Sequence, residues 1–251
     1  MVIGVDRFRA HFAGHEHQYV LIGGAACELI MDEVGLDFRA TKDLDIVLVV
    51  EALDSAFSER FWAFVEQGEY EIRERSEGAK VLYRFQKPKA DGYPAMLELF
   101  SRVPEGMALG DDAHLTPLPI DEAAASLSAI LLDESYYDFL KSMVREAGGI
   151  PVLDEAAIIP FKARAWLDLS RQRDEGVQVD EKNIRKHRND VARLLQLLSQ
   201  EARYTLPGPV ADDMLAFIER ATVEADFDPK QFKVNMSREE VAARLRAAYQ
   251  L

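Results

Sequence analysis

The sequence has little cysteine, no long hydrophobic run and no excess of positive charge. Its single cysteine, Cys27, excludes an internal disulfide and a zinc site made of several cysteines. No apolar run approaches the roughly 18 residues of a membrane-spanning helix, so we expect no membrane partner. The first residues also lack the apolar core of a signal peptide. Together these absences favour a cytoplasmic protein.

The excess of acidic residues limits the partners that the whole surface can attract. There are 44 Asp and Glu against 30 Lys and Arg, which gives a net charge of −14. Repulsion from phosphates therefore disfavours broad nucleic-acid binding. The segment 162–193 is different, because its nine basic residues outnumber its acidic ones and leave a local basic surface open. These nine are Lys162, Arg164, Arg171, Arg173, Lys182, Arg185, Lys186, Arg188 and Arg193.

Motifs of several common enzyme classes are absent. The sequence has no G-x-x-x-x-G-K-[ST] loop, no G-x-G-x-x-G fingerprint and no G-x-S-x-G elbow. It has instead a short apolar run, Tyr19 to Ile22, that ends at Gly23 and Gly24 and is followed by good helix formers. This pattern predicts a buried strand, a glycine turn and a helix.

Two aspartates lie at the entrance of the most strand-like segment of the chain. Residues 46–50 form a continuous and mostly β-branched run, which indicates a central strand covered on both faces. Asp43 and Asp45 are two residues apart, so their side chains leave the strand on the same side. Two such carboxylates repel each other unless a cation or a proton lies between them. The pattern therefore predicts a site for a hard divalent cation such as magnesium.

The order of these features resembles the nucleotidyltransferase superfamily, which has the fold of DNA polymerase β. The resemblance rests on residues 19–50, where a strand, Gly-Gly and a helix precede R-x-T-x-D-x-D on a second strand. Within the superfamily, the chain is most similar to the AbiEii-type nucleotidyltransferases, which include toxins of type IV toxin–antitoxin systems. The resemblance implies that Gly23 and Gly24 cradle a nucleoside triphosphate, and that Asp43 and Asp45 hold two Mg²⁺ ions.

Further site residues follow from the resemblance alone. A third metal-binding carboxylate is expected on a neighbouring strand, where this chain has Glu98 between two leucines. Many members have an aspartate there, and a solvated glutamate on an edge strand is the alternative. Arg39 and Thr41 are expected to contact phosphates or to orient the aspartates. Gly24 stands where many members have a serine, so the backbone cradle is kept and one phosphate-contacting hydroxyl is lost.

The second half of the sequence is helical and carries two more candidates. The resemblance matches Lys162 and Asp190, loosely, to a lysine and an aspartate of AbiEii-type proteins, and we expect both to line the active site. Lys162 also lies in an otherwise apolar segment, which is an unusual place for a charge. The alternative is an ordinary solvated lysine in a charged helix. Helices are predicted over 154–173, 181–200, 209–224 and 238–249, with a kink or restart at Pro160.

These patterns predict an α/β (α+β) fold in which a mixed sheet flanked by helices is followed by a C-terminal helical domain. We place the nucleotidyltransferase catalytic domain at residues 1–149 and the helical domain at 150–251. Near this boundary, residues 134–146 are predicted to form a helix that ends at Gly148 and Gly149.

The sequence therefore predicts a metal-dependent nucleotidyltransferase that moves a nucleoside monophosphate from a nucleoside triphosphate to a hydroxyl acceptor. The toxin resemblance implies a tRNA 3′ end or a protein hydroxyl as the acceptor, and an antitoxin as a possible partner. Two alternatives stay open. One is a small-molecule nucleotidyltransferase of the aminoglycoside-modifying kind, which the overall acidity suits. The other is a degenerate, non-catalytic binding module that keeps the nucleotidyltransferase fold.

Overall fold

The chain forms two compact units, which we call the sheet unit and the helical unit. In the computed structural model, residues 3–72, 82–100, 130–131 and 133–251 are described. The sheet unit comprises Met1–Ile120 and Val144–Leu153, and the helical unit comprises Asp121–Met143 and Asp154–Leu251. The predicted boundary after residue 149 falls within a β-hairpin of the sheet unit.

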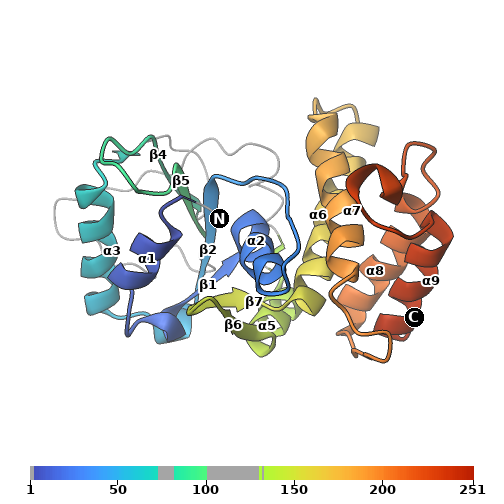
Figure 1. The fold of residues 1–251 in the computed structure, drawn as a ribbon, viewed down its shortest axis with the longest axis horizontal. Coiled ribbons are helices and arrows are strands. Elements are labelled where there is room, and N and C mark those ends of the chain that lie inside the picture. Colours follow the sequence, from blue (N-terminus) through green and yellow to red (C-terminus); the bar gives the residue numbers. More distant parts are fainter. Residues whose placement is uncertain (1–2, 73–81, 101–129, 132) are drawn as a thin grey trace. The chain divides into compact units, whose positions relative to one another are not determined.

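A seven-stranded mixed sheet forms the centre of the sheet unit, in the order β3-β4-β5-β2-β1-β7-β6 (Figure 1). The central strand β2 is antiparallel to β1 and parallel to β5, and β1 is parallel to β7. This arrangement confirms the predicted mixed α/β class. The strands are β1 (Tyr19–Ile22), β2 (Asp43–Leu48), β3 (Glu71–Ile72), β4 (Leu82–Gln86), β5 (Met96–Phe100), β6 (Val144–Ala147) and β7 (Ile150–Leu153).

The sheet unit also contains helices α1 (Val5–His11), α2 (Gly23–Glu33) and α3 (Ser55–Gln67). Helix α2 packs on β1, β2 and β6. Helices α1 and α3 lie side by side in Figure 1 and join through an aromatic cluster, in which Phe8 and Phe64 meet edge to face at 5.6 Å. Phe57, Phe61 and Phe64 of α3 are buried in the core, which fits their helical spacing, whereas Trp62 is partly exposed.

The hairpin formed by β6 and β7 replaces the end of a predicted helix. Helix α5 (Glu134–Ser142) stops at residue 142, and β6 begins at Val144. Gly148 and Gly149 have φ values of +58° and +77°, the left-handed pair that a two-residue hairpin turn requires. These glycines therefore reverse the chain between two strands, and the prediction that they end a helix is wrong.

The helical unit contains α5 and four longer helices, and no helix of the described residues is long and apolar enough to cross a membrane. Helix α6 packs against α5, α7 and α8, while α9 contacts α7 and α8. Asp154 caps α6 and Ser237 caps α9, the second as a full capping box. The four are α6 (Glu155–Asp174), α7 (Glu181–Leu195), α8 (Gly208–Ala221) and α9 (Arg238–Tyr249).

Helix α6 continues through Pro160, so the predicted restart at this proline is wrong, and a kink there stays a prediction. A proline lacks the N–H that would bond to the carbonyl four residues earlier, here that of Ala156. The Tyr249 hydroxyl of α9 donates a hydrogen bond to this carbonyl at 2.8 Å, and both residues are buried. The Ala156 carbonyl thus accepts a hydrogen bond from α9 in place of the missing one within α6, and α6 can continue past Pro160.

Replacing Tyr249 with Phe should lower the free energy of unfolding by about 1–3 kcal/mol, because the buried Ala156 carbonyl would lose its donor. The loss of stability should be smaller in a Pro160→Ala background, because the N–H of Ala at position 160 can donate to the Ala156 carbonyl. Denaturant unfolding of the four members of this double-mutant cycle measures the coupling. Equal losses in both backgrounds would contradict this account of α6.

Candidate active site

Three charged side chains form a row across neighbouring strands of the sheet unit, which we call the carboxyl row. Asp45 of β2 is in register with Glu98 of β5, and Glu98 is in register with Arg84 of β4. Direct cross-strand neighbours project from the same face of a sheet, so the three side chains meet. Arg84 Nε donates to Glu98 Oε1 at 2.7 Å, and a hydrogen bond joins the carboxyl groups of Glu98 and Asp45. Glu98 is only 7% exposed, so it is not a solvated edge-strand residue.

Burial and the neighbouring Asp45 carboxylate raise the pKa of Glu98 to about 8, although Arg84 acts in the opposite direction. Near neutral pH, Glu98 therefore holds a proton and donates it to Asp45. The two carboxyl groups share one proton in a position where a cation could replace it.

Glu98→Gln should make stability less dependent on pH, because its amide imitates the protonated carboxyl group. A raised carboxyl pKa favours folding below the unfolded value of 4.5 and loses that benefit as pH rises toward about 8. Between pH 5 and pH 8, the free energy of unfolding of the wild type should therefore fall relative to Glu98→Gln, by on the order of 3 kcal/mol. Urea unfolding with a metal chelator present tests this, and parallel pH profiles would refute it.

The side chain of Asp45 also lies beside the N-terminus of α2. Gly23, the first residue of that helix, has φ +68°, and a Cβ added to it would lie 1.7 Å from Asp45 Oδ2. Only glycine leaves room for this carboxylate. The first turn of a helix presents unpaired N–H groups and the positive end of the helix dipole, both of which favour anions. The carboxyl row and this cradle are therefore adjacent.

Gly24 is equally confined, by Thr41. A Cβ at position 24 would lie 2.7 Å from Thr41 Oγ1 and 3.0 Å from Thr41 Cβ. A serine at position 24 would therefore require Thr41 to move. The Thr41 hydroxyl lies beside the first turn of α2. Arg39 is half-buried and stacks over the Phe38 ring at 5.2 Å.

The residues of the carboxyl row fit a magnesium–phosphate complex better than a metal cage made only of protein. Within the described part of the chain, no three His, Cys, Asp or Glu side chains are grouped to hold one metal ion. Asp43 is thus not brought into a three-ligand group with Asp45 and Glu98. Magnesium, however, is commonly held by one or two carboxylates together with substrate phosphates. Two carboxyl groups in contact beside a phosphate cradle provide that donor set.

Lys162 and Asp190 pair with each other inside the helical unit. Lys162 Nζ donates to Asp190 Oδ2 at 3.0 Å, and Arg193 Nη1 donates to Asp190 Oδ1 at 3.0 Å. Lys162 is 5% exposed and Asp190 is 0% exposed, so the lysine is not a solvated residue. The two predicted residues meet as a buried ion pair between α6 and α7.

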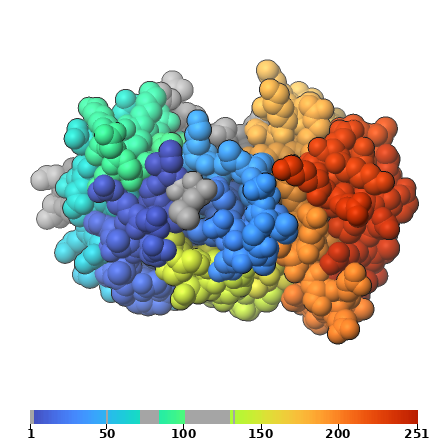
Figure 2. Space-filling model, in the orientation of Figure 1, coloured from blue at the N-terminus to red at the C-terminus, as the bar shows by residue number. Residues whose placement is uncertain are grey.

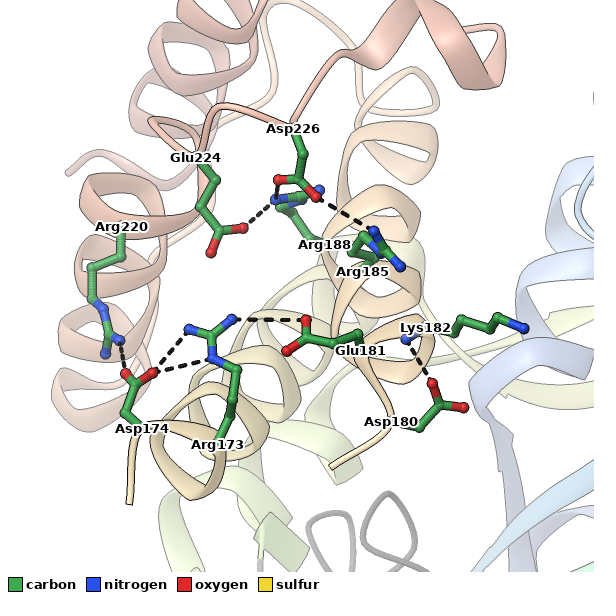
Figure 3. A network of polar contacts seen from close by, with 10 residues as sticks. All are labelled: Arg173, Asp174, Asp180, Glu181, Lys182, Arg185, Arg188, Arg220, Glu224 and Asp226. Carbon is green, nitrogen blue, oxygen red and sulfur yellow. Dashed lines mark hydrogen bonds and ion pairs between the residues drawn. The ribbon is translucent and has the colours of Figure 1, made fainter. Parts of the chain in front are cut away.

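The basic segment of the helical unit is largely neutralised by its own acidic neighbours. At least seven of its nine basic residues form ion pairs: Lys162, Arg164, Arg171, Arg173, Arg185, Arg188 and Arg193. Figure 3 shows part of this network, in which Asp174 pairs with Arg173 and Arg220, and Asp226 pairs with Arg185 and Arg188. The end of α6 and the loop after it, gold to light orange in Figure 2, carry the exposed acidic residues Asp174, Glu175 and Asp180. These pairs weaken the case for an RNA-binding surface here.

Comparisons with known proteins show no family for this chain. No protein-family model matches the chain, and no curated protein matches it. The structure is similar to the crystal structure of an antigenic nucleotidyltransferase-like protein from Paracoccidioides brasiliensis. The identity is 13% and the TM-score is 0.47, over 99% of this chain and 96% of that chain.

Proposed function

We propose that this protein is a metal-dependent nucleotidyltransferase. The observation that carries the proposal is the position of the Asp45 carboxylate, which lies against Gly23 at the N-terminus of α2 and is hydrogen-bonded to Glu98. A triphosphate bound at the first turn of α2 would place its phosphates next to this carboxyl pair. The proposed substrate is thus a nucleoside triphosphate bound as its magnesium complex.

Each residue has a role in this proposal. The N–H groups of Gly24 and Ala25 would bind phosphate oxygens, and the Thr41 hydroxyl would supply the contact that residue 24 lacks. Asp45 and Glu98 would hold the cation. When bound, magnesium would lower the pKa of the acceptor hydroxyl and neutralise charge on the leaving pyrophosphate.

The other predicted residues keep supporting roles. We expect Asp43 and oxygen atoms of the substrate to hold a second Mg²⁺ together. We expect Arg39 to pair with a phosphate. Lys162, held by Asp190, would provide positive charge for the same substrate. Binding and positioning by these side chains, rather than covalent chemistry of the protein, would accelerate the transfer.

The AbiEii-type relationship remains our proposal for the family, with a tRNA 3′ end or a protein hydroxyl as the acceptor and an antitoxin as a regulator. A small cationic acceptor is the second candidate. The ion-paired basic segment and the net charge of −14 favour it over RNA.

Transfer of label from α-³²P-labelled triphosphates tests the proposed activity. Wild type and Asp45→Asn would each be incubated with magnesium and, separately, with total tRNA, cell protein and an aminoglycoside. We expect labelled product and pyrophosphate from the wild type with one acceptor, and at least a 100-fold lower rate from Asp45→Asn. Transfer at equal rates by both proteins would refute the assignment of the site.

A further inference from the structure

The carboxyl row contains a cation of its own. Arg84 contacts Glu98 Oε1 through Nε and also through a second guanidinium nitrogen. Its side chain is 14% exposed and that of Glu98 is 9% exposed, so water screens the charge of the guanidinium weakly. The ladder between β4 and β5 places Arg84 directly opposite Glu98.

Arg84 and a divalent cation would use the same carboxyl group. A metal held between Asp45 and Glu98 would bring two positive charges next to the guanidinium, in a site where repulsion is strong because solvent is scarce. The hydrogen-bonded contact between Arg84 and Glu98 would have to lengthen or rearrange before Glu98 could serve as a ligand. Arg84 would then be available to an anionic group of the substrate.

We propose that Arg84 is an internal counter-ion that competes with the divalent cation for Glu98 and lowers the metal affinity of the site. The inference rests on the proposed function, because it concerns the same pair of carboxyl groups. The opposite role is also physically possible, since hydrogen-bond partners of metal ligands often orient them and their loss lowers metal affinity 10- to 100-fold. The two roles differ in the sign of one measurable effect.

Binding of Mn²⁺, as a spectroscopic substitute for Mg²⁺, distinguishes these roles. Free Mn²⁺ is counted by electron paramagnetic resonance during titration of wild type, Arg84→Met and Lys87→Met at one pH. Lys87→Met is the matched control, because Lys87 follows β4 directly and pairs with the exposed Glu71 at 3.2 Å. We expect Arg84→Met to bind Mn²⁺ at least about tenfold more tightly than the wild type, and Lys87→Met to bind as the wild type does. Equal or weaker binding by Arg84→Met would overturn the inference.

Two further variants serve as controls for the Mn²⁺ titration. Arg84→Gln, which retains a hydrogen-bond donor to Glu98, replaces Arg84→Met if that variant does not fold, and the same gain in affinity is expected. Asp45→Asn combined with Arg84→Met should lose the tight site. If neither wild type nor the Arg84 variants bind Mn²⁺ at a site that needs Asp45, the inference and the metal-dependent function fail together. If the wild type binds Mn²⁺ and transfers nucleotides but the Arg84 variants bind more weakly, only the inference fails.

Discussion

Gly23→Ala should lower the affinity for magnesium–triphosphate at least 100-fold. The added Cβ would lie 1.7 Å from Asp45 Oδ2, so the carboxylate must rotate away. The backbone of Asp45 cannot follow, because it is paired with Ile22 of β1 on one side and Glu98 of β5 on the other. Rotation would break the contact with Glu98 and crowd the phosphate cradle at the same time. Calorimetric titration with a non-hydrolysable triphosphate measures the loss.

Gly35→Ala is the matched control for this substitution. Gly35 has φ +69°, almost the same as the +68° of Gly23, and no atom lies within 4 Å of a Cβ added to it. Both variants therefore carry the same left-handed backbone strain, about 1 kcal/mol. Only Gly23→Ala displaces Asp45. Similar triphosphate affinities in the two variants would show that the cradle beside Asp45 is not the binding site.

Asp190→Asn should be the most destabilising polar substitution in the helical unit, at about 3–5 kcal/mol. Asp190 is fully buried and accepts hydrogen bonds from Lys162 and Arg193. A neutral amide would leave the buried Lys162 ammonium without its counter-charge. The melting temperature should fall by on the order of 10 °C. By contrast Asp174→Asn, which loses exposed ion pairs with Arg173 and Arg220, should change it little.

The double substitution Lys162→Met with Asp190→Leu separates structural support from chemistry. Removing both charges should restore most of the stability, since a buried ion pair can be replaced by packed apolar groups. If Lys162 also serves the substrate, the stable double variant should still lose nucleotide transfer. Wild-type stability in Asp190→Asn would contradict the buried pairing itself.

Much of the sheet unit could be predicted because its signals are local. The β-branched run after Asp45 and the glycines after Ile22 predict β1, α2 and β2, although β2 begins at Asp43 and ends at Leu48, two residues before the run does. The β6–β7 hairpin could not be predicted, since each strand has only four residues and Gly148-Gly149 also suits the end of a helix. Residues 101–129 and 132 lie outside the described residues.

The sequence indicates candidate residues of the site but not the contacts between them. Asp45 and Glu98 were identified as candidates from a motif and a resemblance, and the structure places them in contact. Arg84 was missed, because cross-strand register depends on which strands are neighbours. A signal did exist: Arg84 and Glu98 are each the central residue of a five-residue strand, and each is flanked by hydrophobic residues. The confinement of Gly23 by Asp45 is a tertiary contact that sequence spacing does not reveal.

The most direct test of the account is calorimetric titration of the four nucleoside triphosphates, with and without magnesium, into wild type and Asp45→Asn. The account predicts that the wild type binds at least one triphosphate only when magnesium is present, and that Asp45→Asn loses this binding while remaining folded. Failure of well-folded wild type to bind any triphosphate, or equal binding by Asp45→Asn, would contradict it and favour a non-catalytic binding module.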